Sequence, residues 1–108
     1  MPNLAELMEA IPDRFDPEVA AGLLAVIQFE FSPEETGGFY YITIENNRCT
    51  VERGVHMSPN MTLKIAAADY IELASGRLSH QLAFMTDRLR VNGDLSLATR
   101  LRELLALG

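Results

Sequence analysis

The residues that could carry acid–base, nucleophilic or metal chemistry are few and scattered. His56 falls in a polar connection, His80 lies near a predicted helix start, and Cys49 alternates with Val51 on one face of a predicted strand. Hydrolytic or transfer chemistry needs a nucleophile beside a base or clustered metal ligands, and no Gly-x-Ser-x-Gly or His-Glu-x-x-His pattern occurs. We therefore expect no catalytic residue, no metal and no cofactor. Both histidines are predicted to be surface residues and Cys49 a buried, inert thiol.

Charge is distributed unevenly along the 108 residues, whose formal net charge is −6. Residues 1–60 hold ten acidic and three basic side chains, whereas residues 61–108 hold five acidic and six basic ones. Binding to nucleic acid needs several cations against phosphates, and this acidic chain has a single lysine. We therefore exclude nucleic acid as a partner. Only the second half could approach an anionic surface, which allows at most transient membrane contact.

Composition predicts one folded domain over residues 1–108, with 48% hydrophobic and 22% charged residues. The longest uncharged run, residues 19–29, is far shorter than the roughly 20 apolar residues of a membrane-spanning helix. The acidic first dozen residues do not resemble a signal peptide, and a lone cysteine suits a reducing compartment. The predicted location is therefore cytoplasmic.

Hydrophobic spacing predicts short helices at the start of the chain and strands in its middle. A first helix over residues 4–11 should end at Pro12, and Asp16 and Pro17 should begin a second helix over residues 17–22. Alternation predicts strands over residues 23–32, 39–45 and 48–53, the last two joined by a tight turn at Asn46-Asn47. These three strands should form an antiparallel meander.

In the second half of the chain, the spacing of hydrophobic residues changes from the period of a strand to that of a helix, and then back. A fourth strand is expected over residues 61–65, a helix over 67–75, a helix capped by Ser79 through residue 85, and a fifth strand around 89–91. Asp94 should cap the last helix. Strands followed by helices, with one returning strand, predict an α+β fold with helices mainly on one sheet face.

The run Leu82, Ala83, Phe84 and Met85 is apolar at every position, which exceeds the single stripe that a two-turn helix can bury. Either protein covers this helix on several sides, or one of its sides lines a cavity. Composition favours ordinary core packing, because clusters of Met and aromatic residues are more often core than ligand site.

The chain resembles the sterol carrier protein 2 family of lipid-transfer domains. The residues that carry the resemblance are Thr62-Leu63-Lys64-Ile65, Asp69, Leu73, Gly76, Ala83-Phe84-Met85, Leu89-Arg90-Val91 and Gly93-Asp94, with looser matches upstream to Phe15. Asp87 departs from the family, which usually has glycine before the fifth strand. Aspartate tolerates unusual backbone angles better than most residues, so the turn can survive.

The resemblance implies a five-stranded, mostly antiparallel mixed sheet, with helices covering one face and an apolar tunnel between them. The implied function is non-catalytic carriage of a lipid-like molecule: a fatty acyl chain, phospholipid, sterol or isoprenoid. The candidate lining is Ile27, Phe29, Leu82, Ala83, Phe84, Met85, Leu89, Leu101 and Leu105. The alternative is an accessory or scaffold subunit that presents a lipid or isoprenoid intermediate to partner enzymes, so protein partners are possible. An enzyme is the least favoured hypothesis.

Overall fold

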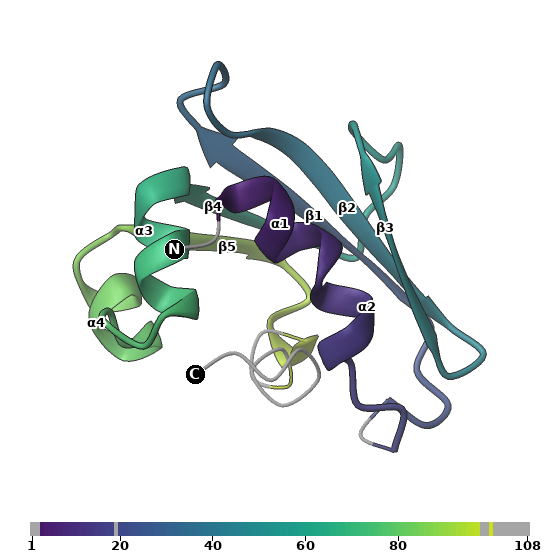
Figure 1. The fold of residues 1–108 in the computed structure, drawn as a ribbon. Helices are drawn as coiled ribbons and strands as arrows, with labels where there is room; N and C mark the ends of the chain where they lie inside the picture. Colours follow the sequence, from purple (N-terminus) through teal and green to yellow (C-terminus); the bar gives the residue numbers. More distant parts are fainter. Residues whose placement is uncertain (1–2, 19, 98–99, 101–108) are drawn as a thin grey trace.

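The structure, a computed structural model, describes residues 3–18, 20–97 and 100. Along the chain, two short helices precede four consecutive strands, and two further helices precede the last described strand (Figure 1). The elements are α1 (Leu4–Glu9), α2 (Ile11–Arg14), β1 (Ala25–Ser32), β2 (Gly38–Glu45), β3 (Arg48–Arg53), β4 (Met61–Ala66), α3 (Ala67–Ala74), α4 (His80–Met85) and β5 (Leu89–Gly93).

The five strands form one sheet in the order β3-β2-β1-β4-β5. The pair β1 and β4 at its centre is parallel, and the other three pairs are antiparallel. The register places Phe29 of β1 between Tyr40 of β2 and Leu63 of β4, so that apolar residues line up across the strands. The predicted meander and the mixed sheet are therefore confirmed.

Local chemistry explains where several of these elements begin and end. Asn46 and Asn47 both adopt positive φ angles, 52° and 59°, which suits the two-residue turn between β2 and β3. Asp87 also has a positive φ, 59°, in the turn before β5, at the position where the resemblance expected glycine. Asp94 Oδ1 accepts a hydrogen bond from the Ser96 amide at 3.0 Å, and residues 95–97 are helical. The predicted cap is thus formed.

Two predicted helices differ in the structure. The first divides at Ala10, because Pro12 lies in the first turn of α2, where a missing N–H costs no hydrogen bond. The second prediction was wrong: residues 17–18 and 20–22 form turns, although Asp16 Oδ1 does accept a hydrogen bond from the Glu18 amide at 2.9 Å. The same side chain can cap a helix or close an isolated turn, and starting a short helix is unfavourable.

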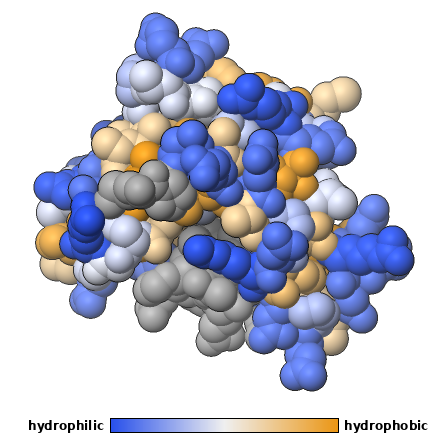
Figure 2. Space-filling view, in the orientation of Figure 1, coloured by the Kyte–Doolittle hydropathy of each residue, from blue (hydrophilic) through white to orange (hydrophobic). Residues whose placement is uncertain are grey.

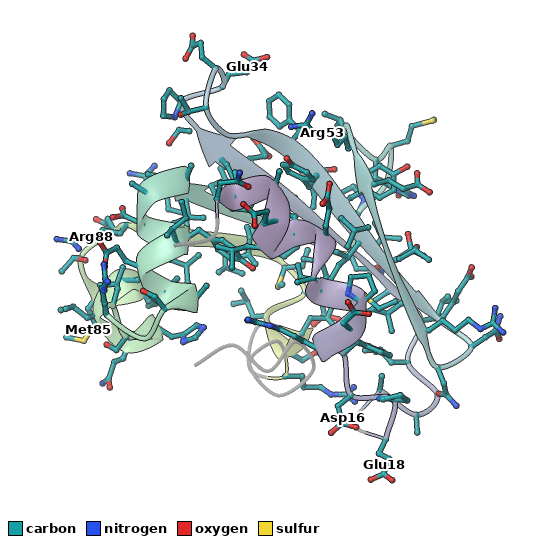
Figure 3. All side chains as sticks on the ribbon, in the orientation of Figure 1. Asp16, Glu18, Glu34, Arg53, Met85 and Arg88 are labelled. Carbon is teal, nitrogen blue, oxygen red and sulfur yellow. The ribbon has the colours of Figure 1, made fainter. Side chains whose placement is uncertain are left out.

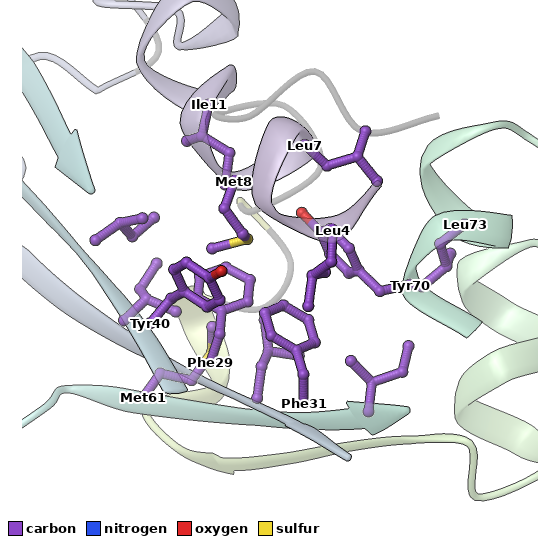
Figure 4. Packing of buried hydrophobic residues seen from close by; sticks show 14 of the residues in the cluster. Leu4, Leu7, Met8, Ile11, Phe29, Phe31, Tyr40, Met61, Tyr70 and Leu73 are labelled. Carbon is purple, nitrogen blue, oxygen red and sulfur yellow. The ribbon is translucent and has the colours of Figure 1, made fainter. Parts of the chain in front are cut away.

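The helices cover one face of the sheet, and the hydrophobic core lies between the two layers (Figures 1 and 4). Strand residues that alternate towards the helices are almost all apolar; the fully buried ones are Ile27, Phe29, Ile42 and Ile44. The outer face is polar, and Glu30, Lys64 and Arg90 lie in one row across β1, β4 and β5. In the described part of the chain, no helix has the length and apolarity needed to cross a membrane.

Candidate apolar ligand site

Strand β1 supplies two of the predicted lining residues. Ile27 and Phe29 lie on its helix-facing side and are fully buried. The Phe29 ring stacks on Phe31, with 5.7 Å between ring centroids, and meets the edge of Tyr70 from α3 at 6.1 Å. Both residues therefore belong to the apolar layer between the sheet and the helices.

Helix α4 is held by hydrogen bonds at both ends. Ser79 Oγ accepts a hydrogen bond from the Leu82 amide at 3.0 Å, as predicted for its N-cap. At the other end, Thr86 Oγ1 donates to the Leu82 carbonyl at 2.7 Å, and the Arg88 amide donates to the Ala83 carbonyl at 2.9 Å. Two turns of helix and the turn through Asp87 thus form a compact unit leading into β5.

The apolar run on α4 is divided between the core and the surface. Ala83 is fully buried, whereas Leu82, Phe84 and Met85 are exposed by 51%, 60% and 72%. Figure 3 shows Met85 beside Arg88 at one end of the molecule, away from the central core. Ala83 therefore packs inside, and its three neighbours present apolar surface to the outside.

The remaining predicted lining residues lie further along the chain. Leu89, at the start of β5, is partly buried and packs against the core. Leu101 and Leu105 lie outside the described residues. Of the nine predicted positions, the structure thus brings Ile27, Phe29, Ala83 and Leu89 into or against the core.

Tyr70 of α3 was not among the predicted lining residues, although it lies within the predicted helix over residues 67–75. The structure buries it against Phe29 and Phe31, with ring centroids 6.1 and 5.0 Å apart. The signal in the sequence was an aromatic residue at a core-facing position of the predicted helix.

The three residues singled out for possible chemistry lie apart. The Cys49 thiol is buried, which raises its pKa to about 11 and keeps it protonated. His56 lies in the loop between β3 and β4, where its Nδ1 accepts a hydrogen bond from the Ser58 amide at 3.0 Å. His80 begins α4. No group of three or more metal-ligating side chains occurs among the residues described.

A separate hollow of about 530 Å³ opens beside the ends of β1, β4 and β5. Most of its side chains are charged: Glu30, Glu34, Lys64, Asp69, Asp87, Arg88 and Arg90. Apolar pockets for lipids carry few charges, so this hollow does not match the predicted tunnel. In the view of Figure 2, apolar side chains form separate patches between hydrophilic ones.

A five-stranded mixed sheet with an apolar, helix-covered face is the architecture that the sequence resemblance implied. The chain belongs to the SCP-2 sterol transfer family, whose model matches residues 4–106. This confirms the family inferred from the sequence and the lipid-transfer class to which the domain belongs.

The relatives include both longer proteins and structures of similar size. Hydroxysteroid dehydrogenase-like protein 2 of Rattus norvegicus is 29% identical over 101 residues, which are 93% of this chain and 19% of that protein. The chain therefore spans about a fifth of the length of this relative. The dehydrogenase-like name describes the longer protein.

Two solved structures share the fold over most of both chains. Sterol Carrier Protein 2 Like 2 from Aedes aegypti has a TM-score of 0.77 at 22% identity, covering 94% of this chain and 92% of its own. The same mosquito protein has also been solved in palmitated form. The ubiquinone synthesis protein UbiJ-SCP2 has a TM-score of 0.73 at 14% identity, covering 95% and 92%. At these identities the likeness establishes the fold.

Proposed function

We propose that this domain binds and carries a lipid or another apolar small molecule between its sheet and its helices. The observation that carries the proposal is the division of α4, which buries Ala83 in the core and leaves Leu82, Phe84 and Met85 exposed beside it. A soluble fold gains nothing from placing three large apolar side chains in water. A carrier needs such a surface at the edge of its binding space.

Apolar burial alone can supply the affinity. Each CH₂ group removed from water contributes about 0.8 kcal/mol, so a long acyl or isoprenoid chain needs no cluster of polar anchors along its length. The helix-facing residues of β1, Ile27 and Phe29, have this apolar character. The palmitated form of the Aedes aegypti relative supports an acyl chain as one ligand class. We further propose that Leu89, Leu101 and Leu105 complete the lining.

Solvent extraction of the purified protein, followed by mass spectrometry, tests the proposal directly. A lipid recovered at one molecule per protein is the expected result. The delipidated protein should then take up fluorescent fatty acid with saturable binding. A protein that yields no lipid and takes up no acyl, sterol or isoprenoid probe would rule out carriage.

A second candidate function is that of an accessory subunit that presents a lipid intermediate to a partner enzyme. The exposed apolar side chains of α4 favour it, and so does the similarity to a ubiquinone synthesis protein. Under this hypothesis, replacing Phe84 and Met85 with glutamine should abolish co-purification of a specific partner while lipid uptake persists. Loss of uptake without loss of a partner would instead favour simple carriage.

We also propose that the domain has no catalytic step of its own. Cys49 is buried and protonated, and the two histidines lie on different elements. Any chemistry in longer relatives would then belong to other parts of those proteins.

A further inference from the structure

Helix α4 presents one side to the core and the opposite side to solvent. Successive residues of a helix are turned by about 100°, which places Leu82, Phe84 and Met85 on an arc of about 160° centred opposite Ala83. The burial agrees with this geometry, because Ala83 is fully buried and the other three side chains are at least half exposed. Leu82, Phe84 and Met85 together form the α4 patch, which points away from the core.

The charges around the α4 patch differ from those of the rest of the chain. Residues 77–92 hold three basic and one acidic side chain, whereas the remaining residues hold six basic and fourteen acidic ones. Arg88 and Arg90 follow α4 and are both exposed, and Figure 3 shows Arg88 beside Met85. Asp87 lines the same hollow as these arginines, with three other acidic side chains, so the local excess of positive charge is small. The α4 patch is therefore bordered by cations on an otherwise acidic protein.

The first helix, α1, lacks both of these properties. It buries Leu4, Leu7 and Met8 in the core, carries Glu6 in its first turn and has no basic residue in its last turn. Helices α2 and α3 expose no large apolar side chain. Of the four helices α1 to α4, only α4 therefore combines exposed apolar side chains with neighbouring cations.

We infer that the α4 patch docks the domain onto an anionic lipid bilayer. The apolar side chains enter the boundary between head groups and acyl chains, as those of interfacial helices do, and Arg88 and Arg90 meet the lipid phosphates. A protein partner would also cover apolar side chains, but the cations beside them match a surface of negative charge. As the place where a carried lipid enters and leaves, this surface rests on the proposed function. The docking itself can be measured without a carried lipid.

A single tryptophan reports the docking, because the chain contains none. Gln81 is exposed on α4 and lies within the arc of the α4 patch. In the full chain carrying Gln81→Trp, emission should shift to shorter wavelength with vesicles that contain phosphatidylglycerol, and brominated acyl chains should quench it. Vesicles of phosphatidylcholine alone should produce a smaller shift, and salt should reverse the larger one.

Met57 provides the matched control position. It is fully exposed in the loop between β3 and β4, away from α4 in Figure 1. The Met57→Trp variant should keep the emission of a tryptophan in water with both kinds of vesicle. Equal shifts in the Gln81→Trp and Met57→Trp variants would show general adsorption of the protein and would overturn the inference.

Further substitutions in the Gln81→Trp background separate the charged and apolar contributions. Arg88→Gln should weaken binding to the anionic vesicles about fivefold, the effect of one cation near such a surface, and leave binding to neutral vesicles unchanged. Phe84→Gln should weaken binding to both kinds of vesicle roughly tenfold. Arg48→Gln removes the same charge at the start of β3 and should change neither.

The remaining outcomes distinguish the docking from the carriage. An unchanged emission of the Gln81→Trp variant with both kinds of vesicle would overturn the docking and leave a protein partner as the occupant of the α4 patch. Uptake of a fluorescent fatty acid from solution, measured without vesicles, tests the carriage separately. Uptake without docking would leave the carriage intact, whereas docking without uptake would overturn the carriage alone.

Discussion

The side chain of Gln28 holds the backbone of His56 across the outer face of the sheet. Gln28 Oε1 accepts a hydrogen bond from the His56 amide at 2.8 Å, and its Nε2 donates to the carbonyl oxygens of Tyr40 and Gly54 at 3.0 Å each. Gln28 is only 2% exposed, the one polar side chain among the described residues that is buried to this extent. The loop between β3 and β4 is therefore fixed to the centre of the sheet.

Replacing Gln28 with alanine should destabilise the fold by about 2 kcal/mol or more, because it leaves buried backbone groups without partners. The measurement is urea unfolding followed by circular dichroism. His56→Asn is the control, because its backbone amide still reaches Gln28; it should change stability by less than about 1 kcal/mol. Equal effects of the two substitutions would show that the His56 side chain, rather than its backbone, matters.

Enlarging Ala83 should separate a packed core from a ligand space. Ala83 is fully buried on the inner side of α4. If ligand normally occupies the space beside it, Ala83→Trp should abolish uptake of fluorescent fatty acid while far-ultraviolet circular dichroism stays native. In a filled core the indole would overpack and cost about 1–3 kcal/mol. Gln81→Trp, at an exposed position of the same helix outside the predicted lining, should retain both uptake and stability.

The Cys49 thiol should be unreactive in the folded protein. Burial raises its pKa to about 11, so the reactive thiolate is scarce at pH 8, whereas the unfolded chain has an ordinary thiol. Reaction with a disulfide reagent should be slow until denaturant is added. Because the folded pKa lies above the unfolded one, this contribution to stability is complete below the ordinary thiol pKa and is lost as the pH rises towards 11. The Cys49→Ala variant should not show this loss of stability at alkaline pH.

Gly93 should tolerate a side chain less well than Gly22. Both have positive φ angles, 102° and 76°, but a Cβ at Gly93 would lie 2.5 Å from the Asn60 carbonyl oxygen, whereas one at Gly22 would meet nothing within 4 Å. Gly22→Ala should therefore cost about 1 kcal/mol of backbone strain, and Gly93→Ala clearly more. Thermal unfolding of the two variants measures the difference. Similar losses of stability in the two variants would show that the positive φ angle, rather than the contact with Asn60, sets the cost.

Periodicity predicted the strands well because each buries one face. The bounds of β3 match the prediction, and Ser79 caps α4 as expected. The predicted helix at residues 17–22 failed because an Asp-Pro signal also suits an isolated turn. The burial of Gln28 was missed for another reason: the loop that covers it comes from a distant part of the chain, and no local pattern records its path.

The candidate site was predictable to a similar degree. Ile27 and Phe29 were identified because strand alternation shows which side chains face inward. The same reasoning could not divide the α4 run into one buried and three exposed residues, because a uniformly apolar run has no polar face to mark its orientation. Tyr70 was not among the predicted lining residues, because only the folded chain brings the ring of α3 against Phe29 and Phe31 of β1.

The parallel pairing of β1 with β4 makes the domain suitable for fragment complementation. The segment before the loop at residues 54–60 contains α1, α2 and the β1-β2-β3 meander, and the segment after it begins with β4 and ends its described strands with β5. Within the sheet, the two segments meet only where β1 pairs with β4. Two peptides cut in this loop should remain largely unstructured alone and reassemble when mixed, which would make association of the halves a direct reporter of folding.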